Sequence, residues 1–114
     1  MNWNPLQTEA DVEALLAESE QHPVLVFKHS TRCSISNTAL NRLDRKWQAA
    51  DNAQVKPYLI DLLNYRPASN RVASLLAVEH QSPQAVVLHK GQVLYVANHL
   101  EIRYEDILAA TEAA

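Results

Sequence analysis

Only one of the 114 residues is a glycine, Gly91, and this scarcity removes several architectures at once. An average chain of this length would contain about eight. Phosphate-binding P-loops and dinucleotide-binding fingerprints each need several glycines where the backbone approaches the ligand, so both kinds of nucleotide site are excluded. Gly91 follows Lys90 between two short apolar segments, and glycine readily takes the positive φ of a tight turn. We therefore predict a hairpin turn at these two residues.

Length and composition indicate a single globular domain, 1–114. The chain is shorter than the roughly 150 residues typical of one domain, and its 47% apolar content is too high for disorder. Ten basic against thirteen acidic residues give a net charge of −3, which argues against nucleic acid as a partner. The longest apolar run covers only 93–97, and no secretory leader is visible. We expect a cytoplasmic protein with no membrane partner, and its oligomeric state stays open.

Apolar residues at helical and strand spacing predict alternating helices and strands. The expected order is a helix over 8–20, a strand over 24–27, a helix over 35–47, a strand over 55–62, a helix after Asn70, strands over 85–88 and 92–96, and a helix over 104–110. Strands joined through a helix should be parallel, whereas the last two should form a hairpin. Pro57 removes a backbone donor, which favours a sheet edge for its strand. The chain should form an α/β domain with a mixed four-stranded sheet flanked by helices.

Cys33 is the only cysteine, which excludes internal disulfides, dithiol C-x-x-C chemistry and multi-cysteine metal sites. It follows a predicted strand and a run of small polar residues, and it opens the next helix. The positive end of a helix dipole and the free backbone N–H groups there favour the thiolate, which is the nucleophilic form. Arg32 adds a positive charge beside it. The alternative is a buried, inert cysteine, but the polar neighbours favour a reactive thiol.

Three further features are candidates for the same site, each with an ordinary structural alternative. Ser36 comes three residues after Cys33 and could donate a hydrogen bond to a thiolate, or be a plain helix serine. His29 could lie behind the thiol or point into solvent. A cis bond between Ser82 and Pro83 would leave backbone groups of Ser82 free for a substrate, although only ~5–6% of such bonds are cis. The five histidines show no metal-ligand spacing, so no metal site is expected.

Three segments resemble one family in the right order and spacing. Residues 27–36 read F-K-H-S-T-R-C-S-I-S, similar to the F-K-H-S-T-x-C-P-I-S active-site segment of monothiol bacilliredoxins of the YtxJ (bacilliredoxin C) type. Residues 79–84 and 98–105 are similar to that family's S-P-Q stretch and its C-terminal S-H-x-x-I-x-Y-E pattern. The resemblance covers almost the whole chain. It departs at Ser34, where the family has a proline suited to the first turn of a helix.

This resemblance implies a thioredoxin-like fold, with the helix over 8–20 as an extra N-terminal element. It also implies a thiol–disulfide oxidoreductase that removes bacillithiol from protein mixed disulfides. Bacillithiol, a small thiol built from cysteine, glucosamine and malate, would be the co-substrate with no bound cofactor, and bacillithiolated client proteins would be the partners. Cys33 would attack the bacillithiol sulfur. An external thiol would then have to free Cys33, because the chain has no second cysteine.

The resemblance also implies that Ser82 and a cis-Pro83 form a backbone shelf for the incoming disulfide. We add from charge alone that Lys28 and Arg32 attract the malate carboxylates. His29 and Lys28 are expected behind the thiol. The residues expected to contact the substrate are, in chain order, Arg32, Ser34, Ser36, Ser82 and Pro83.

Three rival functions stay open. A monothiol glutaredoxin that uses glutathione or holds an iron–sulfur cluster would show C-G-F-S and a later glycine pair, which this chain lacks. A redox-sensing or partner-binding module would carry a reactive Cys33 without catalytic turnover. A redox-silent structural domain would lose no function in Cys33→Ser.

Overall fold

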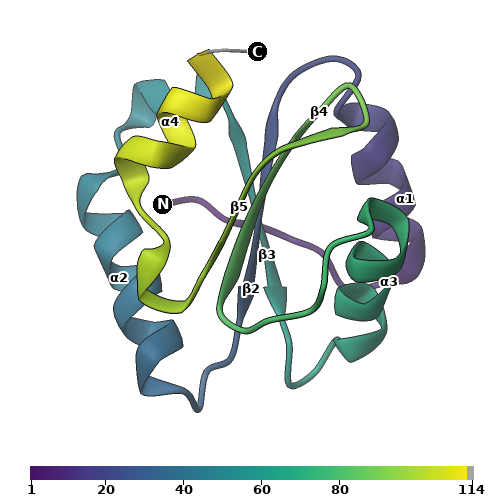
Figure 1. Ribbon diagram of the computed structural model, residues 1–114, viewed down its shortest axis with the longest axis horizontal. Coiled ribbons are helices and arrows are strands. Elements are labelled where there is room, and N and C mark those ends of the chain that lie inside the picture. Colours follow the sequence, from purple (N-terminus) through teal and green to yellow (C-terminus); the bar gives the residue numbers. More distant parts are fainter. Residues whose placement is uncertain (113–114) are drawn as a thin grey trace.

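The computed structural model describes residues 1–112 and contains one mixed sheet with helices on both faces (Figure 1). In chain order the elements are β1 (Asn4–Pro5), α1 (Glu9–Glu18), β2 (Val24–His29), α2 (Ser34–Lys46), β3 (Lys56–Asp61), α3 (Arg66–Leu76), β4 (Gln84–His89), β5 (Gln92–Asn98) and α4 (Tyr104–Glu112), with short 3₁₀ helices at Ala49–Ala53 and His99–Glu101. Helices α2 and α4 cover one face of the sheet, and α1 and α3 cover the other. None of the helices within 1–112 is long and apolar enough to cross a membrane.

The sheet has five strands in the order β1-β3-β2-β4-β5, one more than the sequence predicts. β2 is parallel to β3, and β4 is antiparallel to its neighbours β2 and β5. The additional strand, β1, contains two residues and pairs with β3 through Asn4 and Tyr58. Two residues are too few to carry a hydrophobic period, so no pattern in the sequence marks this strand.

Pro57 does not lie at the open edge that its missing donor suggested, because β3 has β1 on one side and β2 on the other. Lys56 donates its N–H to the Pro23 carbonyl on the β2 side (3.1 Å), so the next residue along the strand turns its backbone groups toward β1. There the side-chain amide of Asn4 donates to the Pro57 carbonyl (3.0 Å). The proline nitrogen therefore faces the outer side of β3, where only a two-residue strand covers it.

Helix α3 begins at Arg66, before Pro67 and Asn70 rather than after them. Pro67 lies in the first turn, where a backbone N–H would have no acceptor within the helix. The missing N–H of proline is therefore tolerated there. The helix ends at Leu76, and its C-cap residue Ala77 has a φ of 53°, the left-handed conformation that glycine usually supplies. A small residue thus takes the place of the missing glycine.

The turn between β4 and β5 has the geometry that the sequence predicts. Lys90 has a φ of 53° and Gly91 a φ of 71°, which is the pair of positive angles found in a two-residue hairpin turn. The Lys90 N–H donates to the Ser19 carbonyl (2.8 Å), which ties the turn to the end of α1.

Two clusters of buried apolar side chains lie on opposite faces of the sheet. Phe27 of β2 belongs to the cluster under α2 and α4, and Val26 belongs to the cluster under α1 and α3. Successive side chains of a strand point to opposite faces, so the last two residues of β2 must also diverge. Lys28 therefore points to the α3 side, and His29 points toward α2.

Candidate active site

Cys33 is the N-cap residue of α2, directly after the loop that leaves β2. Its carbonyl accepts the Asn37 N–H (3.0 Å), and its own N–H donates to the Ser30 carbonyl (3.1 Å), so the backbone on both sides is fixed. The thiol is free and partly exposed. No side chain caps the helix, which leaves the first-turn N–H groups of α2 without a side-chain partner. The structure thus places the one thiol of the chain where a reagent can reach it.

Arg32 and Ser34 flank Cys33 in the chain, and both side chains are exposed. Ser34 is the first residue of α2, so the helix starts at the same position without a proline there. Both residues lie close enough in the chain to contact a molecule bound to the thiol.

Ser36 is wholly buried, which corrects the expectation that it contacts the substrate. Its Oγ lies 2.6 Å from Nδ1 of His29 and accepts the Ser30 N–H (3.0 Å). Burial lowers the pKa of His29, and the opposing effect of Asp61 and Asp44 does not offset it. A neutral His29 can accept the Ser36 hydroxyl proton at Nδ1 in the tautomer that carries its own proton on Nε2. Ser36 faces inward because the first turn of α2 packs on the sheet.

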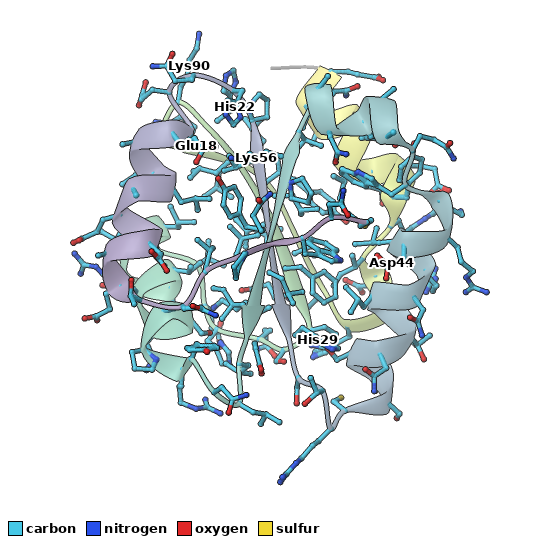
Figure 2. The ribbon with its side chains drawn as sticks, turned by 180° about the vertical axis from the view of Figure 1, so that it is seen from behind. Glu18, His22, His29, Asp44, Lys56 and Lys90 are labelled. Atoms are coloured by element: carbon cyan, nitrogen blue, oxygen red, sulfur yellow. The ribbon has the colours of Figure 1, made fainter. Side chains whose placement is uncertain are left out.

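His29 is 5% exposed and joins β2 to the start of α2 through this hydrogen bond. Figure 2 shows it near the end of the sheet opposite to Lys90, between the strands and α2. It therefore lies behind the active-site loop and not in solvent.

Lys28 is fully buried, so it cannot attract a carboxylate from solvent as its charge suggested. Its Nζ lies 3.2 Å from Nδ1 of His80, and Ser69 Oγ of α3 lies 3.4 Å from the same atom. Burial lowers the pKa of Lys28 to about 8. Strand alternation is the reason for its position, because it sends this side chain into the layer between the sheet and α3. The expectation of a malate contact at Lys28 is wrong.

Pro83 is buried, follows Ser82 through a cis peptide bond and precedes β4. Gln84 pairs with Lys28 across the sheet, so the Ser82–Pro83 step and the loop before Cys33 lie at the same end of the strands. Ser82 Oγ is buried and has no hydrogen-bond partner among the described residues. The active-site loop and the cis-proline loop thus meet at one end of the inner strands β2 and β4.

A groove of about 680 Å³ opens beside these two loops. Its lining residues come from the start of α2, the loop before Pro83, and the end of β5 with the 3₁₀ helix that follows it, namely Ile35, Gln81, Asn98, His99, Leu100 and Glu101. The His99 N–H donates to the Pro83 carbonyl (2.9 Å), which holds the third segment against the second. Sequence reasoning missed this groove because its walls are far apart in the chain. The only signal was that all three segments belong to the family resemblance.

The family model described as monothiol bacilliredoxin BrxC matches residues 4–107, which include every site residue above. The chain belongs to the monothiol bacilliredoxin BrxC family. This confirms the resemblance seen in the sequence. Membership in the BrxC family, together with the fold, makes the protein a thiol–disulfide oxidoreductase by class.

Solved structures share the fold of this BrxC-family chain. A protein with a thioredoxin fold, whose proposed activity is that of an oxidoreductase, is 26% identical with a TM-score of 0.78 over 96% of this chain and 92% of its own. Thioredoxin from Fasciola hepatica is 16% identical (TM-score 0.71, coverage 96% and 97%). Thioredoxin from Trypanosoma brucei brucei is 13% identical (TM-score 0.72, coverage 98% and 89%). The thioredoxin-like fold is therefore confirmed.

Proposed function

We propose that this protein removes bacillithiol from mixed disulfides on client proteins. The observation that carries the proposal is the single cysteine, Cys33, partly exposed at the start of α2 in a chain of the monothiol bacilliredoxin family. A protein with one thiol can hold a bacillithiol adduct but cannot resolve it by an internal disulfide. The chemistry therefore needs two intermolecular exchanges.

In the first exchange, the Cys33 thiolate attacks the bacillithiol sulfur of the client's mixed disulfide. A sulfur–sulfur bond forms between Cys33 and bacillithiol, and the bond between bacillithiol and the client breaks. The client leaves as a thiolate and takes a proton from water. Cys33 is oxidised to a mixed disulfide while the client cysteine is reduced to a thiol. One disulfide replaces another, so this exchange needs no further oxidant or reductant.

In the second exchange, an external thiolate attacks the bacillithiol sulfur on Cys33. If that thiol is bacillithiol itself, the products are oxidised bacillithiol and the Cys33 thiolate. This step fits a cytoplasmic location, where a pool of reduced thiols is maintained. The cysteine count requires it, since no other thiol exists in the chain.

The backbone around Ser82 and Pro83 would support the incoming disulfide at the end of the strands where the active-site loop also lies. Arg32 and Ser34 are exposed beside the thiol and would contact the bacillithiol moiety. Ser36 and His29 act from behind, as positioning residues: their hydrogen bond and the Ser30 N–H hold the loop that carries the thiol.

The direct test uses a purified client protein that carries one bacillithiol mixed disulfide. A catalytic amount of this protein is added with excess bacillithiol, and intact mass follows the client. We expect many equivalents of free client thiol per equivalent of wild-type protein and none above background with Cys33→Ser.

A glutathionylated form of the same client serves as the control, and it should react more slowly. Release of no more than one client equivalent, with Cys33 left as a stable adduct, would contradict turnover and indicate a redox-sensing module.

A further inference from the structure

The groove beside the active-site loop has the mixed chemistry of a small-molecule site. Its volume of about 680 Å³ lies within the ~300–1,000 Å³ range of ligand pockets. Ile35 and Leu100 are 43% and 49% exposed, which is unusual for large apolar side chains and gives the groove two apolar walls. The lining also includes the polar side chains of Gln81, His99 and Glu101.

Those three polar side chains make no hydrogen bond to another residue within 1–112, so their donors and acceptors remain open to a ligand. An amide supplies both donors and an acceptor, and a carboxylate supplies acceptors only. Such a set suits the hydroxyl groups of a sugar, each of which donates and accepts. The groove therefore offers partners to the glucosamine part of bacillithiol.

Arg42 lies next to the groove and is not part of its lining. Its guanidinium donates to the carbonyl of Leu100, on the segment that forms the groove wall (3.3 Å). It also borders a second hollow of about 380 Å³ that contains Arg45 and Arg103. Within residues 1–112, none of these three arginines has a carboxylate partner within salt-bridge distance, whereas the neighbouring Lys46 pairs with Glu105. A guanidinium without a carboxylate partner is the group best suited to bind carboxylates in two-point geometry.

The spacing along α2 matches the length of bacillithiol. Arg42 comes nine positions after Cys33, a rise of about 14 Å at 1.5 Å per residue. Helix side chains lean back toward the N-terminus, which shortens this gap. About nine bonds join the bacillithiol sulfur to its malate carboxylates, roughly 11 Å when extended. Because the whole chain carries −3, its overall field does not attract an anionic disulfide, and local arginines have to supply the attraction.

We infer that this groove, together with the neighbouring Arg42, is the binding site for the glucosamine–malate part of bacillithiol. The inference rests on the proposed function and gives it a site. The sugar lies between Ile35 and Leu100 and bonds Gln81, His99 and Glu101. The malate carboxylates bind Arg42, with Arg103 next to it. Charge alone had assigned the malate carboxylates to Lys28 and Arg32. Arg42 takes the place of the buried Lys28 in that role, and it makes bacillithiol a better substrate than an uncharged disulfide.

The test compares rate constants for adduct formation on Cys33 with two disulfides, oxidised bacillithiol and the uncharged bis(2-hydroxyethyl) disulfide. Arg42→Gln should lower the rate constant for oxidised bacillithiol about tenfold, the effect of losing one charge-assisted hydrogen bond. The rate constant for the uncharged disulfide should stay within about twofold of wild type, because Arg42 does not touch the reacting sulfur. Lys90→Gln is the matched control: it removes the same charge at the opposite end of the sheet (Figure 2) and should change neither rate constant.

A second readout does not depend on chemistry at the thiol. Glucosaminyl malate, which lacks the cysteine of bacillithiol, should shift the backbone amide resonances of Gln81, His99 and Leu100 in the reduced wild-type protein. Equal rate losses for both disulfides in Arg42→Gln, or resonance shifts confined to other regions, would overturn the site. Those results leave the proposed function intact. Failure of wild-type protein to react with oxidised bacillithiol, while it reacts with the uncharged disulfide, would overturn both.

Discussion

At the scale of single residues, two neighbours at the end of β2 have opposite roles although they are adjacent in the chain. His29 points toward α2 and holds Ser36 by a hydrogen bond of 2.6 Å, so it supports the active-site loop. Lys28 points to the other face and is buried, and among residues 1–112 only the His80 ring lies within hydrogen-bonding distance of it. A buried ammonium without a carboxylate is costly, because desolvation penalises the charged form. Lys28 therefore lowers the stability of the folded state at neutral pH.

Lys28→Met should raise the free energy of unfolding by about 2 kcal/mol at pH 7, since methionine fills the same space without a charge. In wild-type protein the Lys28 pKa falls from 10.5 to about 8 on folding. Between these values the unfolded chain binds the proton and the folded chain does not, so wild-type stability should rise as pH increases from 8 to 10.5. Urea unfolding at several pH values measures both effects. Two results would contradict this account: a Lys28→Met protein that is less stable than wild type at pH 7, or one whose stability still rises above pH 8 as that of wild type does.

At the scale of elements, α2 begins at Ser34 without the proline that the family has at this first helical position. Cys33 has φ −103° and ψ 120°, which are angles that a residue before proline also adopts. Ser34 is exposed at the first helical position, where the backbone N–H has no acceptor within the helix. The backbone around the thiol is thus already compatible with proline.

Ser34→Pro should therefore stabilise the protein by about 0.5–1 kcal/mol, because proline restricts the unfolded chain without straining the folded one. The denaturant midpoint, with an unchanged slope, measures this effect. The same variant should still form the Cys33 adduct. A drop in the midpoint would show that the Ser34 N–H or hydroxyl has a structural role which the helix geometry does not reveal.

At the scale of the whole molecule, a polar network holds α1 against the sheet at the end far from Cys33. Figure 2 shows Glu18, His22 and Lys56 together there. Glu18 accepts hydrogen bonds from Lys56 (3.0 Å) and Tyr58 and pairs with His22 (3.2 Å). Partial burial raises the pKa of Glu18, but the hydrogen bonds from Tyr58 and Lys56 outweigh it, so the pKa lies below its ordinary 4.5.

This network predicts a contribution to acid stability. A carboxyl group whose pKa is lowered by folding stabilises the protein above pH 4.5, and that contribution disappears as pH falls through the folded-state pKa. Glu18→Gln should cost about 1 kcal/mol at pH 7, the amount expected for a charged hydrogen-bond network that is partly exposed. Its stability should also decrease less than that of wild type between pH 4.5 and pH 2. Parallel pH profiles for the two proteins would refute the role of Glu18.

The sequence predicts most of the fold and the position of the nucleophile, because both depend on local signals. Apolar periodicity marks the helices and the longer strands, and Lys90-Gly91 marks the hairpin turn. Prediction from the sequence fails where a residue's position depends on which side of a strand it faces or on which distant segment it contacts. The backbone of Pro57 faces the outer side of an inner strand, and the side chain of Lys28 is buried on the α3 face of the sheet. The groove joins Ile35 to segments more than 40 residues away in the chain. Only packing in three dimensions decides these points.

The central claim is that Cys33 exchanges selectively with bacillithiol. The measurement that tests it most directly is intact mass after brief exposure of the reduced protein to oxidised bacillithiol, with oxidised glutathione in parallel and Cys33→Ser as control. We predict one rapid bacillithiol adduct on wild-type protein, slow reaction with glutathione, and no adduct on Cys33→Ser. Equal rates with both disulfides, or no adduct from either, would contradict the claim.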